Sequence, residues 1–505
     1  MWKKVLASVL AVALIGYAGF YFVTERELDR MWGGLTGIAD PDLSPAGPAN
    51  YAIIGADVLA PSGDRFLRGY RVMIEDGVIV SVEENAGPMP DVPVIDGEGL
   101  FLIPGLTDSH VHLWESENDL LLYLANGVTS VREMNGSAKM LRWRDEIAAG
   151  RPGPDLFITA PQLGTFGPIE GAFVGWTQRK TIVRSRKDIE KAVRRFERMG
   201  YDALKSSSFL SDAHYAAFGD VAGQSALALT GHIPVAADLE DFFSAGPSEV
   251  AHVEEIAKAL DRAFGGYTPE TAEAYLDFVR SRSGVVAQRL KAEGIAATST
   301  LFLIDSIHRQ RADVGAALAD VELAYANPGI TEGSFITDRG MGWLPDVNIY
   351  RADESWDEAR RARSVAYWKV YAQAQHIVFE ALLEEGVTIL AGTDANVPPM
   401  VPGFSLHDEL DTLEEAGMSP AEVLASATAA PAGWEGQQRG RIAEGYEADL
   451  VLLRENPLQN ISATRSIEMV VKSGRVFGRS DLDAMLHAVK EENDVSRTAS
   501  IPVSN

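Results

Sequence analysis

The sequence contains no cysteine among its 505 residues. This absence excludes a disulfide framework, a thiolate nucleophile and a cysteine-bound zinc site. Basic residues are also few, with 45 lysines and arginines against 72 aspartates and glutamates, which gives a formal net charge of -27. This balance argues against nucleic acid, or an anionic membrane surface, as a partner of a basic face. Because there is no cysteine, any metal must be held by histidine, carboxylate or lysine-derived ligands.

The N-terminus begins with an apolar run that differs from the rest of the chain. Residues 5–23 carry no charge, and as a helix they would span about 28 Å, close to the hydrophobic thickness of a bilayer. No clear small-residue cleavage site follows the run, which favours an uncleaved signal anchor over a removed export signal. We expect a membrane-anchored protein with an extracytoplasmic, periplasmic catalytic domain, or an exported protein.

The two flanks of the remaining chain show β patterns. Short apolar runs split by Gly, Asp and Pro turns fill residues 51–104, where Asp76-Gly77 is a hairpin signal, and similar runs return in 431–480. These outlying runs cannot easily belong to the central part of the chain. We therefore expect one small β-sandwich built from both flanks.

The central part, residues 105–430, alternates helix and strand patterns. Apolar positions at helical spacing end at Gly200 and at Gly386, and each is followed by a short strand pattern. Alternating helices and strands argue for a parallel sheet in an α/β domain. The remaining segments are a signal-anchor or transmembrane helix (1–30), a linker (31–50) and a C-terminal helix or tail (481–505).

Metal-binding side chains recur at the ends of the predicted strands. In GLTDSHVH, residues 105–112, His110 and His112 lie two apart, so both imidazoles project from one face of an extended strand. Further downstream, the residues that follow or end short apolar runs are Lys205, His232, His252 and Asp394. A polar residue at the carboxyl end of successive strands is typical of the active site of a (β/α)8 barrel.

These motifs resemble those of the amidohydrolase superfamily of metal-dependent hydrolases, and within it the imidazolonepropionase-like or Xaa-Pro-dipeptidase-like branch. The similarity runs from about Tyr51 to Phe477 and rests on the motifs IDGEGLFLIPGLTDSHVH, GVTSVREM, YDALKSS, TGHIP, EVAHVEEI, AGTDA and IAEGYEADLVLL. The resemblance implies a TIM barrel that holds two divalent metal ions, with zinc as the expected metal. The implied ligands are His110, His112, a carboxylated Lys205, His232, His252 and Asp394. Glu133, in VREM, stands where relatives often have Asp.

The chemistry of these residue types agrees with the implied site. Neutral imidazoles suit zinc, and a bridging oxygen anion lets two cations sit about 3.5–4 Å apart. A lysine cannot bridge as an ammonium. If burial lowers its pKa, however, the free amine can take up carbon dioxide and become a carbamate with two oxygens to share.

The expected reaction is hydrolysis of an amide, in a dipeptide or an N-acyl amino acid. A metal-bridging hydroxide would attack the carbonyl carbon, and Asp394 would act as general base and then as general acid toward the leaving amine. Two alternatives stay open: a lactonase or phosphotriesterase-type hydrolase using the same site, and a non-catalytic membrane-anchored scaffold. One scaffold supports many chemistries in this superfamily, so the resemblance leaves the substrate open.

Candidate substrate contacts lie after the predicted ligands and in a long segment before Asp394. His407 and Glu409 follow Asp394 by a short loop and could face the pocket. The segment FITDRGMGWLPDVNIYRADESW, residues 335–356, is rich in Gly, Pro and aromatics, and loops of this size in compact domains are usually functional. It offers Trp343, Tyr350 and Arg351. A small-molecule or dipeptide-like substrate, the membrane through the N-terminal helix and a homo-oligomer are the expected partners.

Overall fold

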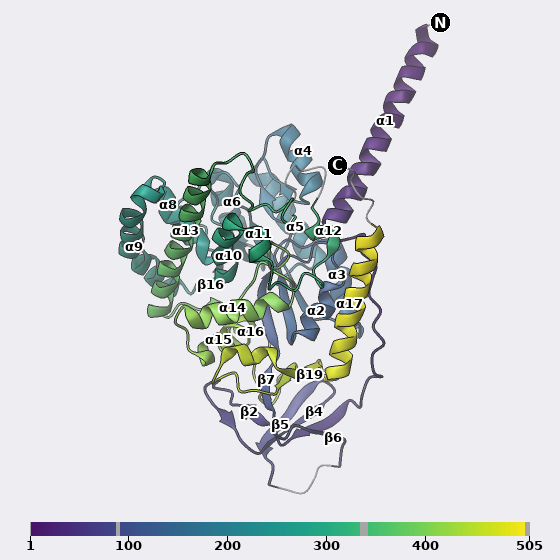
Figure 1. Cartoon of the computed structure of the whole chain (residues 1–505), viewed down its shortest axis with the longest axis vertical. Coiled ribbons are helices and arrows are strands. Elements are labelled where there is room, and N and C mark those ends of the chain that lie inside the picture. The colour runs from purple at the N-terminus through teal and green to yellow at the C-terminus, as the bar shows by residue number, and fades with distance from the viewer. Residues whose placement is uncertain (1, 87–90, 334–341, 500–505) are drawn as a thin grey trace.

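The computed structural model describes residues 2–86, 91–333 and 342–499. Most helices form a body around short parallel strands, while longer strands gather at the lower end of the view, next to the C-terminal helix α17 (Arg479–Ala499) (Figure 1). One continuous apolar core runs from the β-rich end into the helical body. The helical body carries the residues singled out above as metal ligands.

Parallel strands form the centre of the helical body. They make three sheets, in the orders β10-β9-β8, β12-β11-β13-β14 and β15-β16-β17. An isolated bridge between Thr159 and Ala203 links the first sheet to the second, and another between Val111 and Ala395 links the first to the third. The strands are β8 (Leu106–Val111), β9 (Val128–Glu133), β10 (Asp155–Ile158), β11 (Leu163–Gly164), β12 (Thr181–Ile182), β13 (Ala203–Ser206), β14 (Ala228–Gly231), β15 (Glu249–Val250), β16 (Ala296–Thr298) and β17 (Ile389–Leu390).

This arrangement confirms the predicted α/β class and is consistent with a TIM-barrel-like domain. Within the described residues, however, the ladders do not close into one continuous barrel. Several strands are only two residues long, so each offers few backbone groups for pairing with its neighbours.

Helices alternate with these strands along the chain. They are α2 (Asp119–Ala125), α3 (Ala138–Ala148), α4 (Pro168–Thr177), α5 (Arg186–Met199), α6 (Asp212–Ala222), α7 (Leu239–Ser244), α8 (Val253–Phe264), η1 (Pro269–Thr271), α9 (Ala272–Glu293), α10 (Leu301–Ala312), α11 (Val314–Ala317), α12 (Pro328–Thr331), α13 (Glu358–Glu384), α14 (Phe404–Glu415), α15 (Pro420–Ser426) and α16 (Ala429–Glu435). As predicted, α5 ends at Gly200, whose φ of +81° favours glycine, and a strand follows.

Both flanks of the chain contribute to the β-rich end. One sheet has the order β5-β4-β1-β6, and a six-stranded sheet has the order β20-β19-β18-β7-β2-β3. In the second sheet β18 lies antiparallel to β7, with Leu450 opposite Pro104, so segments more than 300 residues apart are neighbours. The strands are β1 (Asn50–Ile54), β2 (Asp57–Leu59), β3 (Phe66–Leu67), β4 (Tyr70–Glu75), β5 (Val78–Glu84), β6 (Val94–Asp96), β7 (Phe101–Pro104), β18 (Leu450–Leu453), β19 (Ile467–Lys472) and β20 (Arg475–Gly478); η2 (Ile461–Arg465) precedes β19.

The predicted hairpin at Asp76-Gly77 is confirmed. These residues join the antiparallel strands β4 and β5, and both have positive φ, +47° and +81°. A two-residue turn with positive φ at both positions matches the twist of the flanking strands.

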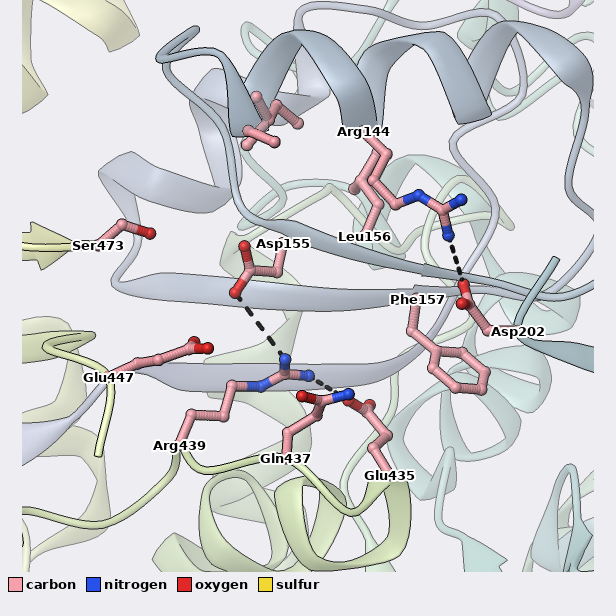
Figure 2. Close-up of a pocket in the computed structure, with 12 residues that line it drawn as sticks. Arg144, Asp155, Leu156, Phe157, Asp202, Glu435, Gln437, Arg439, Glu447 and Ser473 are labelled. Carbon is pink, nitrogen blue, oxygen red and sulfur yellow. Dashed lines mark hydrogen bonds and ion pairs between the residues drawn. The ribbon is translucent and has the colours of Figure 1, made fainter. Parts of the chain in front are cut away.

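A cavity of about 390 Å³ lies where the β-rich end meets the helical body (Figure 2). Asp155, at the start of β10, lines it together with Arg439 and Glu447 from the segment that leads into β18. The acidic groups here are balanced, because Lys472 Nζ lies 2.9 Å from Asp155 and 3.2 Å from Asp449. This ion-paired junction lies at the amino end of the parallel strands, opposite the predicted ligands.

Helix α1 (Trp2–Met31) extends away from the body and contacts it through its C-terminal end (Figure 1). The helix does not stop where the apolar run stops at Val23. It continues through a charged segment in which Leu28 and Met31 are buried. Arg30 there pairs with Glu27, at 2.7 Å, and donates to the backbone oxygen of Gly333.

The predicted membrane anchor is contradicted. Within residues 2–86, 91–333 and 342–499, no helix combines the length and the apolar character needed to cross a membrane. The physical difference from the prediction is that the apolar run is one part of a longer helix whose charged end packs on the body. The prediction of a membrane-anchored protein with an extracytoplasmic catalytic domain is therefore wrong.

A buried ion pair crosses the interior of the strand assembly. Arg132 on β9 donates to Glu249 on β15, and both side chains are fully buried. The Glu249 carboxylate also accepts hydrogen bonds from Thr230 on β14 and Thr298 on β16. Side chains from three other strands, β9, β14 and β16, thus donate to this one carboxylate. Removing one member of a buried pair leaves the other charge uncompensated.

We therefore expect Glu249→Gln to lower the free energy of unfolding by about 3 kcal/mol, measured by urea denaturation. Glu273→Gln, at an exposed position of α9, is the control and should change stability by less than about 0.5 kcal/mol. Equal stability of the two variants would show that the pair does not stabilise the fold.

Candidate active site

The first strand of the helical body presents two histidines. His110 lies on β8 and is fully buried, and its Nδ1 atom is 3.2 Å from the backbone oxygen of Ala251. Because a carbonyl oxygen can only accept, Nδ1 is the donor of this contact, and Nε2 is the unprotonated nitrogen of the ring. Nε2 faces Lys205 Nζ at 3.0 Å and Asp394 Oδ1 at 3.4 Å. His112 follows on the same face, with Nε2 3.1 Å from Asp394 Oδ1.

Two further histidines are held by their Nδ1 atoms. His232 follows β14, and its Nδ1 lies 2.9 Å from Glu255 Oε1. His252 is the N-cap residue of α8, and its Nδ1 lies 3.0 Å from Thr300 Oγ1. The ring centroid of His252 lies 4.2 Å from the ring centroid of His110 and 5.2 Å from that of His232. Partners of this kind orient an imidazole so that its other nitrogen can bind a metal.

Burial sets the protonation state of these rings. Removal from water lowers the pKa of His110, His232 and His252 below the ordinary value for histidine. The rings are then neutral at physiological pH, the form that binds metals. For His112, burial acts in the same direction, but the carboxylates of Asp394 and Glu133 outweigh it and raise the pKa.

Lys205 lies on β13 with none of its surface exposed. Burial disfavours the ammonium form and lowers the pKa of Lys205 to about 8, although nearby carboxylates, that of Asp394 first among them, oppose the shift. A fully buried lysine whose nitrogen faces an imidazole is an unusual arrangement, because charged side chains are almost never fully buried unless they are paired.

Asp394 closes the group after β17. Its φ of +59° is in the left-handed region, which is uncommon for a residue other than glycine and often marks a functional site. The conformation is fixed by its backbone N–H, which donates to the backbone oxygen of His110 at 2.8 Å. Burial would raise the pKa of Asp394, but the hydrogen bond and charge of His112 outweigh burial and hold it below the ordinary value.

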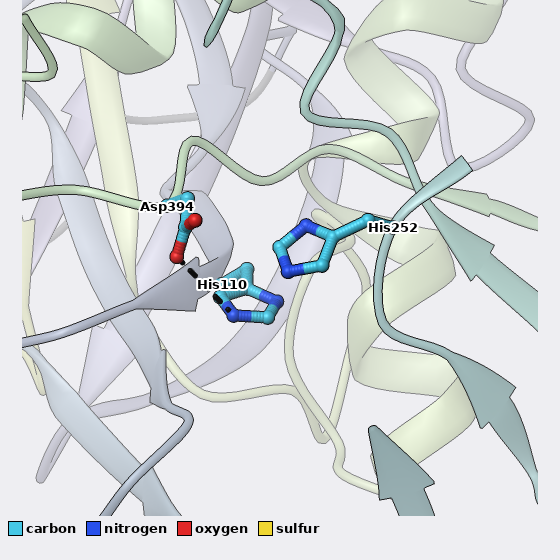
Figure 3. Close-up of side chains that lie close together, drawn as sticks. All are labelled: His110, His252 and Asp394. Carbon is cyan, nitrogen blue, oxygen red and sulfur yellow. Dashed lines mark ion pairs between the residues drawn. The ribbon is translucent and has the colours of Figure 1, made fainter. Parts of the chain in front are cut away.

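The donor atoms of His110, His252 and Asp394 all lie within 4.8 Å of one another (Figure 3). Asp394 Oδ1 faces Nε2 of His112 at 3.1 Å and Nε2 of His110 at 3.4 Å. Unprotonated nitrogens and a carboxylate oxygen that converge in this way fit a divalent cation. The structure thus brings all six predicted ligands together, while their role as metal ligands stays a prediction.

Comparisons with known proteins agree with this geometry. The model of the amidohydrolase family matches residues 276–477. The chain carries an amidohydrolase family domain. Of the six predicted ligands, Asp394 lies in the matched range, whereas the others precede it.

Two curated relatives extend the similarity over most of the chain. An ochratoxinase from Aspergillus niger is 23% identical over 468 residues, which cover 85% of this chain and 87% of the relative. An imidazolonepropionase from Anaeromyxobacter dehalogenans is 25% identical over 477 residues, or 86% and 96% of the two chains. Among solved structures, a Xaa-Pro dipeptidase with bound methionine shares the fold with a TM-score of 0.60 and 17% identity, over 85% of this chain and all of its own. The predictions of amidohydrolase resemblance and of hydrolase activity are confirmed.

Two of the predicted substrate contacts are occupied elsewhere in this amidohydrolase fold. Both ring nitrogens of His407 lie against fold residues, at 2.9 Å from Thr464 Oγ1 and 3.1 Å from the Asn126 oxygen. The carboxylate of Glu409 accepts from two backbone N–H groups at the start of α10. These positions give no support to a role in substrate binding.

The other three candidates come from the long segment before Asp394, of which residues 335–341 lie outside the described residues. Trp343 is fully buried in a small apolar cluster. The backbone oxygen of Arg351 accepts from Arg311, and its guanidinium lies 3.7 Å from Glu354. Burial raises the pKa of Tyr350, and the charges of Glu254 and Asp394 add to this effect.

The sequence reasoning missed the residues that hold the histidines in place. Glu255 and Thr300 orient His232 and His252, and Trp114 packs against His112 with ring centroids 6.2 Å apart. A signal existed for Trp114, which continues the two-residue spacing of His110 and His112. No comparable signal existed for Thr300, because it follows a different strand.

The pKa of His407 gives a test of its structural role. Burial lowers this pKa to about 3, compared with about 6.5 in an unfolded chain. The unfolded state therefore binds the proton first, and the stabilisation from neutral His407 is complete above about pH 6.5 and is lost as pH falls toward 3. We expect the stability difference between wild type and His407→Gln to shrink by roughly 5 kcal/mol across this range, measured by urea denaturation. A difference that does not change with pH would contradict the shift.

Proposed function

We propose that this protein is a binuclear metal-dependent hydrolase that cleaves amide bonds in dipeptides or N-acyl amino acids. The observation that carries the proposal is the convergence of His110, His252 and Asp394 on one point, with Lys205 Nζ 3.0 Å from His110 Nε2. Because the ligating groups come from the ends of different strands, the arrangement is a property of the whole fold. The eight principal parallel strands, β8–β10 and β13–β17, would form a TIM barrel around it.

The four histidines, Lys205 and Asp394 would provide the ligand set. His110, His112, His232 and His252 would bind through imidazole nitrogens, and zinc suits such ligands. When bound, two divalent ions supply Lewis-acid activation of water and of the scissile carbonyl group.

Lys205 would act as a carbamate. Its free amine adds to the carbon of carbon dioxide and releases one proton, which forms an N–C bond and leaves a carboxylate with two oxygens. Complete burial of Lys205 favours this reaction, because the uncharged amine is the form stable away from water.

Asp394 would move the proton during hydrolysis. Its Oδ1 atom lies within 3.4 Å of Nε2 of both His110 and His112, so it faces the centre of the group. The carboxylate can accept the proton of the attacking water and then give it to the leaving nitrogen. A leaving amine needs this proton, which makes the group suited to amides.

The substrate class is supported by the comparisons and by the residues around the cluster. The curated relatives and the Xaa-Pro dipeptidase structure bear hydrolase names. The charge of Asp394 acts on two further polar side chains, since it helps to raise the pKa of both Tyr350 and Glu254. A site with a few polar groups beside a reactive centre is suited to a small, polar substrate.

Metal content gives the first test. We expect two divalent ions per chain in metal-replete protein, measured by elemental analysis, and loss of most metal and activity in Lys205→Ala, because alanine provides no bridging oxygen. A short carboxylic acid added to Lys205→Ala should restore part of both. Lys187→Ala, at an exposed position, is the matched control. Full activity and two metals in Lys205→Ala would exclude Lys205 as the bridge.

Asp394→Asn tests the amide specificity. Amide turnover should fall by roughly 10²-fold or more, whereas an activated p-nitrophenyl ester, whose leaving group needs no proton, should lose much less. Metal occupancy is measured in the same variant, so that lost metal is not mistaken for lost proton transfer. Equal loss on both substrates at full occupancy would contradict the general-acid role. Activity of the wild type on lactones or phosphotriesters, with none on amides, would favour those reactions.

A further inference from the structure

His112 is supported differently from the other histidines of the cluster. The Nδ1 atoms of His110, His232 and His252 each contact a hydrogen-bond partner. The Nδ1 atom of His112 is buried and has no such partner among the described residues. The Oε1 atom of Glu133 lies 3.8 Å away, which is too far for a hydrogen bond.

Glu133 is also held by other groups. Its Oε2 accepts the backbone N–H of Leu113 at 2.6 Å, and its Oε1 accepts that of Asn135 at 2.7 Å. These bonds fix the carboxylate to the backbone that follows β8 and to the backbone that follows β9. The Nε2 side of the His112 ring faces Asp394 at 3.1 Å, so it is the Nδ1 side whose position must depend on packing.

Trp114 provides that packing. Its ring lies nearly parallel to the His112 ring, with an interplanar angle of 13° and centroids 6.2 Å apart. The φ of Trp114 is +47°, a left-handed conformation that a bulky residue rarely adopts. Such a conformation persists only where the surroundings fix it.

Trp32, from the segment after α1, fixes Trp114 in two ways. The edge of its ring packs against the Trp114 ring at 4.8 Å between centroids and an angle of 65°. Its backbone oxygen accepts the N–H of Glu115, the residue after Trp114, at 2.9 Å. Trp32 is itself half-buried, and its Nε1 donates to the backbone oxygen of Thr177 at 3.2 Å.

The backbone around Trp32 is packed against the long segment that leads to Asp394. Asn327 Nδ2 donates to the Gly33 oxygen at 3.1 Å, and Thr36 Oγ1 donates to Asn327 Oδ1 at 2.9 Å. A Cβ atom at Gly33 would lie 2.8 Å from Asn327 Nδ2, so only glycine fits this approach. The segment is thus held directly after the tryptophan.

We propose that Trp114 and Trp32 are positioning residues for His112, and that their ring packing replaces the Nδ1 hydrogen bond that this histidine lacks. Trp32 acts through Trp114, and Trp114 acts through His112. The N-terminal segment after α1 is then part of the support of the metal site. This inference rests on the proposed metal site.

The test measures zinc affinity rather than activity. Zn²⁺ is titrated into metal-free full-length protein in competition with a chromogenic chelator, and thermal unfolding of each variant is followed in parallel. We expect Trp114→Leu to weaken zinc binding by about 10- to 100-fold, the usual effect of losing a group that orients a ligand. Trp32→Leu should weaken it in the same direction, and Trp32→Phe, which keeps an aromatic edge, should bind nearly as wild type.

Two comparisons separate positioning from general destabilisation. The double variant Trp32→Leu/Trp114→Leu should bind no more weakly than Trp114→Leu alone, because residues that act in series are not additive. In a His112→Ala background, Trp114→Leu should have no further effect. Trp2→Leu is the matched control, since Trp2 is on α1 and 87% exposed, and it should bind as wild type.

The outcomes also separate this inference from the proposed function. Wild-type zinc affinity in both Trp114→Leu and Trp32→Leu, or the same loss when His112 is absent, would overturn the positioning role and leave the metal site intact. Absence of zinc binding in the wild type would overturn both. If Trp114→Leu does not fold, the pair Trp32→Leu and Trp32→Phe decides: equal affinity in these two variants would overturn the proposal.

Discussion

Parallel strands that end at the same level force the residues after them into one small volume. In this protein those residues are a buried lysine, four histidines and an aspartate, drawn from five strands. So many ionisable groups cannot all keep their ordinary charge away from water. The rest of the structure follows from how the fold satisfies that constraint.

The fold meets it by fixing which atoms carry protons. Backbone and side-chain oxygens contact the Nδ1 atoms of three histidines, and burial keeps those rings neutral. Asp394 stays ionised because His112 faces it, in spite of its burial. The result is a set of unprotonated donor atoms that point toward one centre. Divalent cations are the charges that would complete such a set.

The supports of the site come from segments far apart in the chain. Glu255 lies close in sequence to the histidine cluster, whereas Thr300 follows another strand and Trp32 comes from the segment after α1. Asn327, which precedes α12, donates a hydrogen bond to the backbone of Gly33, directly after Trp32. A site assembled in this way depends on the packing of loops as much as on the strands that carry the ligands.

Local patterns in the sequence were sufficient for much of the fold. Gly200 ends a helix and Asp76-Gly77 forms a hairpin as predicted, because both depend on backbone conformations that neighbouring residues determine. The six predicted ligands could be named for a related reason: each lies on or just after an apolar run, and strand ends converge in an α/β fold. The hydrolase assignment followed from motifs that are contiguous in the chain.

Tertiary structure alone decided the features that depend on partners distant in sequence. An apolar run at the N-terminus predicted an anchor, but it could not reveal that the helix continues through charged residues onto the body. The proximity of His407 to Asp394 in sequence suggested a pocket residue, yet α14 directs its ring toward Thr464 and Asn126. The sequence by itself determined which residue types stand at the strand ends. Only packing decided which rings are held by hydrogen bonds and which, like His112, lie against a neighbouring ring, because hydrogen bonds and ring contacts form between side chains that the chain order does not bring together.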